Sequence, residues 1–451
     1  MIVPGEDRTG PGPHALDPGG TRRITRGQWL VLAAAVFGWM FDGVEIGLPP
    51  IMGRPALTDL VGSELAGDPR DDLGKSADEK EVSARQREGK VARLLGVLGA
   101  MFLVGAAAGG IMFGWLGDRF GRVRTMILSV LTYSLFTGAA YWAEVPWHLM
   151  VLRFIASMGM GGQWSLGVAL VVESWPGIAR PVLAGVIGAA ANVGFLMIST
   201  LGYVFPVTPT SWRWIMVAGA SPALLVFFIA IFVPESERWK AAVRKGASSP
   251  IKEIFAPALR SKTLIAIVLS AIPLLGTWGS VQWIPYWVDK TLAPLDPSAK
   301  SLTQIWSSVG AILGCLIAPV LGGRWGRRPV YFGMCLMSLV ACLYMFLVLK
   351  TFDGWFLATS TVVGGITASF YGWLPLYLPE LFPTRVRATG QGLSFNSGRI
   401  LAAIGVILGS GQIAGFFGGY QIAGAVISLV YILGLAAIWL APETKGQPLP
   451  D

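Results

Sequence analysis

A short basic motif occurs twice in this chain, about two hundred residues apart. Residues 114–124 read Gly-Trp-Leu-Gly-Asp-Arg-Phe-Gly-Arg-Val-Arg, and residues 322–328 read Gly-Gly-Arg-Trp-Gly-Arg-Arg. Glu173 and Glu380, which follow the two copies, are 207 residues apart. A recurrence at a nearly constant offset indicates that the second half of the chain duplicates the first.

Apolar stretches long enough to cross a lipid bilayer flank both copies of the motif. Only 14% of the residues are charged and 53% are hydrophobic, whereas roughly a quarter of a typical soluble domain is charged. We therefore predict an all-α membrane protein with twelve transmembrane helices in two pseudo-symmetric six-helix halves. The expected spans are about 28–50, 93–116, 125–143, 148–172, 181–205, 213–233, 263–288, 304–322, 329–349, 354–378, 389–410 and 419–441.

The Lys and Arg residues of the loops indicate the orientation, because they gather on one side of the predicted membrane. The positive-inside rule makes that side cytoplasmic, so we expect an inner-membrane protein with both termini in the cytoplasm. The net charge of +9 is explained by this topology, and a nucleic acid partner is not needed. The expected parts are a disordered tail (1–27), an N-terminal half (28–233), a cytoplasmic linker (234–262), a C-terminal half (263–441) and a tail (442–451).

The outer loop between the first two spans, residues 53–92, carries an insertion of mixed charge. It could be a solvated decoration or a cap that captures substrate, and the sequence does not choose between them. The three cysteines fall inside spans, and the chain has only two histidines, His14 and His148. We therefore expect neither a metal site nor a cofactor, and no enzymatic activity. The expected partners of a monomeric chain are the lipid bilayer, a small-molecule substrate and protons.

With these motifs the chain resembles a transporter of the major facilitator superfamily over nearly its whole length. The motif at residues 114–122 is that superfamily's most specific signature, although Gly323 replaces Asp118 in the second copy and Val123 stands where a basic residue is usual. Further blocks resemble its metabolite:proton symporter branch, which includes sugar porters and aromatic-acid symporters. These blocks are 42–45 (Asp-Gly-Val-Glu), 153–162, 234–239 (Pro-Glu-Ser-Glu-Arg-Trp), 383–390 and 442–446 (Pro-Glu-Thr-Lys-Gly).

Acidic and basic residues with equal spacing recur at the cytoplasmic boundary of both halves. Glu173 precedes Arg180 by seven residues, and Glu380 precedes Arg387 by seven. Ion pairs in such partly desolvated places are stronger than exposed ones, so they could close the inner side when the two halves rock. The alternative is static anchoring by the positive charges. The predicted gate residues are Asp118, Arg119, Arg122, Glu173, Arg180, Arg324, Arg327, Glu380 and Arg387.

Charged residues deep inside spans cost roughly 2.5–3.5 kcal/mol each even on a lenient scale, so they indicate function. With a rise of about 1.5 Å per residue, Asp42 and Glu45 in span 1 reach a depth similar to that of Arg153 in span 4. The resemblance implies that the span 1 carboxylate accepts the coupled proton while Arg153 pairs with it. A buried structural salt bridge is the alternative.

Arg399 is expected near the middle of span 11, without a carboxylate among its neighbours in the helix. A guanidinium in this place could hold the carboxylate of a substrate through two parallel hydrogen bonds. It could instead be a partner for Asp42 within the protein, and both could hold in different transport states.

Several polar and aromatic residues are candidates for the substrate cavity. The chain's two asparagines, Asn192 and Asn396, lie in the corresponding spans 5 and 11 and project from similar faces. They could contact substrate or join helices by hydrogen bonds. Spans 4, 7 and 10 line the cavity in the superfamily, although aromatic rings in spans more often serve packing. Their candidate residues are Gln163, Gln282, Trp283, Tyr371 and Trp373.

These observations favour a proton-coupled symporter of a small organic acid, with aromatic acids included. A sugar:proton symporter is the alternative, because the blocks at 234–239 and 442–446 are shared with sugar porters. Against it, span 7 has a single Gln282 and no asparagine, and a buried Arg399 suits an anion better than a neutral polyol. A sensor that does not transport is a third class, but the short terminal segments offer no output element.

Overall fold

The computed structural model describes residues 24–65, 77–175, 179–244, 250–296, 299–408 and 419–450, and the regular structure in these ranges is helical. We call 28–233 the N-terminal half and 263–441 the C-terminal half. The helices of the N-terminal half are α1 (Arg26–Leu65), α2 (Ala77–Phe120), α3 (Arg122–Ala139), α4 (Pro146–Ser174), α5 (Arg180–Val204), α6 (Arg213–Gly219) and α7 (Ala223–Phe232).

Two short helices, α8 (Glu237–Arg244) and α9 (Pro250–Ile254), lie in the linker between the halves. The second set consists of α10 (Pro257–Gly279), α11 (Ile284–Trp287), α12 (Ala299–Trp325), α13 (Arg327–Leu347), α14 (Gly354–Tyr377), α15 (Arg387–Leu408), α17 (Tyr420–Ser428) and α18 (Val430–Ala437). Single 3₁₀ or π turns connect some of them, at Ala140–Trp142, Val281–Trp283, Val288–Leu292, Leu378–Glu380, Thr384–Val386 and Ile438–Leu440.

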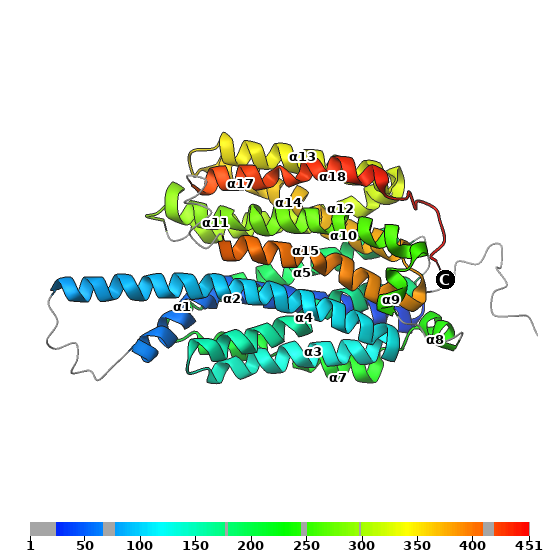
Figure 1. The fold of residues 1–451 in the computed structure, drawn as a ribbon, viewed down its shortest axis with the longest axis horizontal. Coiled ribbons are helices and arrows are strands. Elements are labelled where there is room, and N and C mark those ends of the chain that lie inside the picture. Colours follow the sequence, from blue (N-terminus) through cyan, green and yellow to red (C-terminus); the bar gives the residue numbers. More distant parts are fainter. Residues whose placement is uncertain are drawn as a thin grey trace, which may run out of the picture.

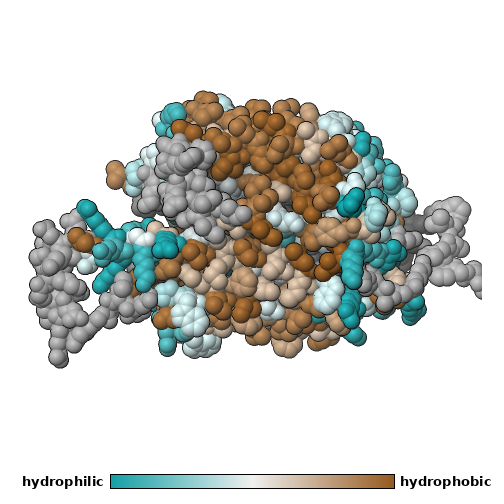
Figure 2. Space-filling model, viewed as in Figure 1, coloured by the Kyte–Doolittle hydropathy of each residue, from teal (hydrophilic) through white to brown (hydrophobic). Residues whose placement is uncertain are grey.

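Ten helical segments in the described ranges are long and apolar enough to cross a membrane. The expected spans 354–378 and 389–410 correspond to α14 and α15, which are 24 and 22 residues long and are not among these ten. Both pack inside the bundle, α14 against α12 and α15 against α2 and α10. With these two, each of the twelve predicted spans contains helix in its described part. Figure 2 shows the apolar belt across the middle of the molecule, with hydrophilic residues toward its two ends.

The helices run nearly parallel, with the N-terminal half on one side and the C-terminal half on the other (Figure 1). Glycine permits the closest approaches between them. A Cβ atom on Gly310 of α12 would lie 1.9 Å from the carbonyl oxygen of Thr361 in α14, so a larger residue there would push these two helices apart.

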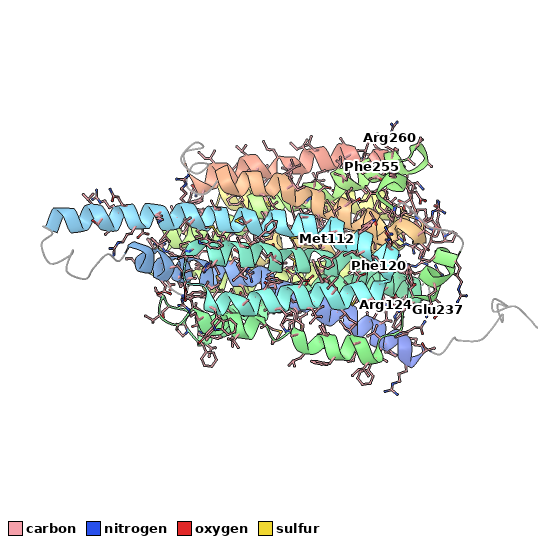
Figure 3. The ribbon with its side chains drawn as sticks, turned by 60° about the horizontal axis from the view of Figure 1, so that its bottom comes forward. Met112, Phe120, Arg124, Glu237, Phe255 and Arg260 are labelled. Atoms are coloured by element: carbon pink, nitrogen blue, oxygen red, sulfur yellow. The ribbon has the colours of Figure 1, made fainter. Side chains whose placement is uncertain are left out.

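The two ends of the bundle differ. One end, the basic end, carries both loop motifs and the linker, and Figure 3 shows Arg124, Glu237 and Arg260 there. At the other end, the hairpin end, α1 and α2 extend beyond the rest of the bundle (Figure 1).

The described parts of residues 53–92 lie at the hairpin end. In its described parts this segment continues α1 as far as Leu65 and begins α2 at Ala77. Leu57 is fully buried in a hydrophobic cluster with Trp212, and the Asp59 carboxylate accepts hydrogen bonds from Trp212 Nε1 at 3.0 Å and Arg213 Nη1 at 2.7 Å. These contacts tie the extension of α1 to the N-terminal half.

Candidate functional site

A cavity lies between the two halves, on the side nearer the hairpin end. It encloses about 540 Å³, part of which is open to solvent. Five helices line it: α1, α5, α10, α12 and α14. Its lining residues are Gly43, Ile46, Ala191, Asn192, Phe195, Thr277, Val281, Gln282, Gln304, Ser307, Ser308, Ala311, Gly364, Thr367 and Ala368.

Glu45 and Arg153 form a buried ion pair beside this cavity. Arg153 Nη1 lies 2.7 Å from Glu45 Oε2, and its Nη2 donates to the Glu45 carbonyl oxygen at 3.3 Å. Thr137 of α3 joins the pair, because its hydroxyl donates to Glu45 Oε1 at 2.5 Å and accepts from Arg153 Nη1 at 2.9 Å. Three helices of the N-terminal half thus meet at one carboxylate whose charge is compensated by a single guanidinium.

Asp42 and Arg399 lie between the halves and interact electrostatically. Both are buried, and neither oxygen of Asp42 has a hydrogen-bond partner in the described part of the chain. Arg399 Nη1 donates to Asn396 Oδ1 at 2.5 Å, and its guanidinium lies 5.2 Å from the centre of the Phe395 ring. No carboxylate among the described residues comes within ion-pair distance of Arg399. A buried cation is therefore held by one neutral oxygen and an aromatic face.

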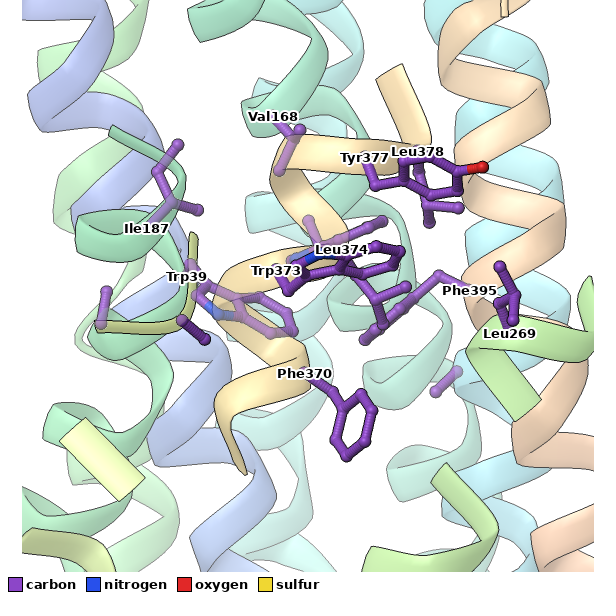
Figure 4. Close-up of a cluster of buried hydrophobic side chains, with 14 of the residues drawn as sticks. Trp39, Val168, Ile187, Leu269, Phe370, Trp373, Leu374, Tyr377, Leu378 and Phe395 are labelled. Atoms are coloured by element: carbon purple, nitrogen blue, oxygen red, sulfur yellow. The ribbon is translucent and has the colours of Figure 1, made fainter. Parts of the chain in front are cut away.

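Large aromatic side chains close the bundle on the basic-end side of these charges. Trp164 and Phe395 stack with ring centres 4.1 Å apart, and Trp39 lies 6.3 Å from each of them. Figure 4 shows Trp39, Trp373 and Phe395 within one buried hydrophobic cluster. Because this cluster draws on both halves, it separates the cavity from the basic end.

Asp118 and Arg122 join the two halves at the basic end. The Asp118 carboxylate accepts from the backbone N–H groups of Ala388 and Thr389 at 3.2 and 2.8 Å, and Arg122 donates to the Thr384 carbonyl oxygen at 2.8 Å. Glu173 is the second connection.

Glu173 binds one arginine from each half. Its Oε1 lies 3.1 Å from Arg122 Nη2 and 3.1 Å from Arg387 Nη1. All three side chains are buried, so the basic end is closed by charge-assisted hydrogen bonds shielded from water.

The second loop motif builds a similar network within the C-terminal half and the segment that follows it. Arg327 binds Glu380 with two hydrogen bonds of 2.7 and 3.0 Å, and Thr444 donates to Glu380 at 2.5 Å. The corresponding bond beside the N-terminal half runs from Ser236 of the linker to Glu173. Gly323 takes the place of Asp118 because the site is filled: a Cβ atom there would lie 2.9 Å from Pro181 of α5.

The remaining predicted gate residues are less involved. Arg180 interacts electrostatically with Glu380 across the halves, but it forms no ion pair among the described residues. Arg119 and Arg324 are exposed, and the Arg119 guanidinium lies 5.5 Å from the Trp115 ring centre.

Glu235 and Glu443, one in each of the blocks 234–239 and 442–446, cap helices. Gly121 and Gly326 lie within the two loop motifs and both have positive φ angles, 110° and 106°. Gly121 is the N-cap residue of α3, and Gly326 is the N-cap residue of α13. Glu235 accepts from the first free backbone N–H groups of α3, and Glu443 accepts from those of α13, at 2.9 to 3.1 Å. Carboxylates are favoured at helix N-termini, so these blocks stabilise the start of both helices.

The Glu443 carboxyl group is tuned by this capping role. Partial burial alone would raise its pKa, but the backbone N–H groups of Arg327, Arg328 and Lys445 outweigh that effect and hold the pKa below its ordinary value.

The predicted substrate-contacting residues are divided between cavity and packing. Asn192 and Gln282 line the cavity. Asn396 is buried and donates to the Gly392 and Gly161 carbonyl oxygens. Gln163 is buried against Gly38, and the ring centres of Tyr371 and Phe395 are 6.2 Å apart. The side chain of Trp283 lies outside the described residues.

Sequence reasoning missed Thr137 and the polar residues of α12, among them Gln304 and Ser307. A single threonine, glutamine or serine in a span has no pattern that separates a functional role from packing. The rotation of α12 that turns Gln304 and Ser307 into the cavity comes from its packing on α14.

Comparison with known proteins agrees with this architecture. A model of the Major Facilitator Superfamily matches residues 83–406. The chain is 30% identical over 366 residues to a putative metabolite transport protein of Haemophilus influenzae, covering 77% of this chain and 86% of that protein. It is 30% identical over 369 residues to the cis,cis-muconate transport protein of Acinetobacter baylyi, covering 78% and 86%.

Among solved structures, the proton:xylose symporter XylE bound to 6-bromo-6-deoxy-D-glucose is similar, with a TM-score of 0.72 and 18% identity over 94% of this chain and 98% of that one. Helical architecture, duplicated loop motifs and sequence relatives lead to one conclusion. This chain belongs to the Major Facilitator Superfamily, as a multi-pass membrane transporter.

Proposed function

We propose that this protein is a proton-coupled symporter of small organic acids that works by alternating access, with its basic end in the cytoplasm. The observation that carries the proposal is the environment of Arg399. A buried cation without a paired carboxylate is costly, so a binding partner that brings a negative charge is strongly favoured.

A substrate carboxylate suits this position. The planar guanidinium can donate two parallel hydrogen bonds to a carboxylate. Arg399 interacts electrostatically with Asp42, and Gly43, the next residue of α1, lines the cavity. The relative from Acinetobacter baylyi is named for transport of muconate, which is a carboxylate.

Glu45 is the proposed proton acceptor, with Asp42 as the second carboxylate of the site. Glu45 is compensated by Arg153 alone, so protonation would release that arginine and change the contacts among α1, α3 and α4. Such a change in a closely packed core is a suitable trigger for a movement of the halves.

The arrangement corresponds to the state that loads substrate from outside. The basic end is closed by Asp118, Arg122, Glu173 and Arg387, while the cavity lies toward the hairpin end. Separation of these pairs and of the aromatic cluster would then open the site to the cytoplasm.

A sugar:proton symporter is the second candidate, favoured by the amides and hydroxyls that line the cavity. Whole-cell uptake of labelled acids and sugars, with and without a protonophore, tests both. Uptake of acids that the protonophore abolishes supports the proposal. Uptake of neutral sugars but not of acids would favour the second candidate instead. Acid uptake that is insensitive to the protonophore would contradict the proton coupling in the proposal.

A further inference from the structure

We infer that the substrate is a hydroxylated, saturated ring carboxylic acid rather than a planar aromatic one. The carboxylate part of this inference rests on the proposed function, whereas the ring and its hydroxyl groups are inferred from the two walls of the cavity. One wall carries most of the hydrogen-bonding side chains, together with Val281, Ala311, Gly364 and Ala368, and the other wall is mostly apolar.

The polar wall belongs to the C-terminal half. It presents hydrogen-bonding side chains from α10, α12, α14 and the 3₁₀ turn after α10: Thr277, Gln282, Gln304, Ser307, Ser308 and Thr367. Part of this capacity is already used within the protein. Thr277 interacts with the Tyr371 hydroxyl, Gln304 Nε2 donates to Ser308 Oγ at 3.4 Å, and Thr367 donates to the carbonyl oxygen of Val363 and can only accept from a ligand.

The opposite wall belongs to the N-terminal half and consists mainly of apolar groups. Gly43, Ile46, Ala191 and Phe195 contribute to it, and Asn192 is its polar member. Phe195 is the one aromatic ring among the described residues that line the cavity. This wall suits the C–H face of a saturated ring, and it provides little of the stacking surface that a flat aromatic ring would use on both sides.

Closure of the site makes these groups decisive. While the cavity is open, water can satisfy the amides and hydroxyls, but alternating access removes that water when the substrate is enclosed. Each polar group left without a partner then weakens binding, and a site built to bond hydroxyl groups discriminates strongly against analogues that lack them. A ligand with several hydroxyl groups on one face and a carboxylate at one end satisfies the polar wall and Arg399 together.

Thermal stabilisation of the purified, detergent-solubilised protein tests the inference, because a ligand that binds the folded state raises its melting temperature. The probes are three hydroxylated ring acids (D-glucuronate, D-galacturonate and quinate), cyclohexanecarboxylate, benzoate and D-glucose. Cyclohexanecarboxylate keeps the ring and the carboxylate without hydroxyls, and glucose keeps the hydroxyls without a carboxylate. At least one hydroxylated acid should stabilise the protein at a concentration about tenfold lower than any of the last three require.

The outcomes separate the two proposals. Stabilisation by benzoate or cyclohexanecarboxylate that equals that of the best hydroxylated acid would overturn this inference and leave the acid symporter standing. Stabilisation by glucose equal to that of the hydroxylated acids would overturn the requirement for a carboxylate, whereas the binding of hydroxyl groups by the polar wall would stand. No effect from any of the three hydroxylated acids would overturn the inference.

A variant of the polar wall gives an independent measurement. Gln304→Met keeps the length of the side chain but removes its amide, so the affinity for the best hydroxylated acid should fall about tenfold. Gln86→Met is the matched control, since Gln86 is exposed near the start of α2, a helix that does not line the cavity. Equal affinities in both variants and the wild type would contradict the role of the wall.

Discussion

Asn192 and Arg399 occupy equivalent positions in the two halves. Each lies 12 residues beyond the arginine, Arg180 or Arg387, that begins its helix. The amide of Asn192 is neutral, lines the cavity and donates to Cys315 Sγ at 3.5 Å. The side chain of Arg399 is a buried cation. The duplicated scaffold thus carries a neutral amide in one half and a cation at the equivalent position of the other half.

Arg399→Lys should bind acids more weakly than the wild type by about ten- to a hundredfold, because an ammonium group cannot form the two parallel bonds of a guanidinium. Arg399→Ala should abolish acid uptake. Both are measured as the concentration dependence of uptake in proteoliposomes. Wild-type affinity in Arg399→Lys would demote Arg399 to a partner of Asp42 within the protein.

Asp118→Asn should open the basic end more than Glu380→Gln does. Asp118 bonds to the other half. Among the described residues, Glu380 accepts hydrogen bonds from Arg327 and Thr444 on its own side, and its link to Arg180 is only electrostatic. The measurement is alkylation of a single cysteine at Ser394, a buried position, in a background without the native cysteines. Asp118→Asn should raise the labelling rate several-fold. Equal rates in both variants would contradict the expectation that Asp118 contributes more than Glu380 to closing the basic end.

Much of this architecture follows from the sequence, for particular reasons. Apolar stretches and duplicated motifs predict the spans. The similar depths of Glu45 and Arg153 predict that these side chains meet, and in the structure Arg153 Nη1 lies 2.7 Å from Glu45 Oε2. Two partners of Asp118 in the other half could not be predicted, because they are backbone N–H groups of α15 and carry no residue signature. The equivalence of Asn192 with Arg399, rather than with Asn396, becomes visible only when the helix starts are aligned.

Thr137→Val should reduce proton-driven uptake about tenfold, whereas Thr137→Ser should retain it. The Thr137 hydroxyl positions the ion pair, because it donates to Glu45 and accepts from Arg153. Valine has the same shape without that group. Initial rates of uptake with an imposed pH gradient provide the comparison. Similar losses in both variants would assign Thr137 to packing alone.

Glu443→Ala should lower the thermal stability at neutral pH by about 1 kcal/mol through the loss of the helix cap on α13. Because the pKa of Glu443 is lower in the folded protein than in an unfolded chain, its carboxylate stabilises the fold at pH values above the unfolded pKa. That contribution is lost as the pH falls through the folded pKa, so the wild type and the variant should converge in acid. The control is Glu237→Ala, at an exposed side chain whose ion pair among the described residues is with Lys240. A difference that persists unchanged in acid would contradict the capping role.

The most direct test of the whole account is the transport of a labelled acid by Glu45→Gln in proteoliposomes. A glutamine cannot bind and release a proton, so the variant should fail to accumulate the acid against its gradient when a pH gradient is imposed. Exchange of internal for external acid needs no net proton movement and should persist, which shows that the variant is folded and binds substrate. Accumulation by Glu45→Gln equal to that of the wild type would place the coupled proton elsewhere and contradict the central claim.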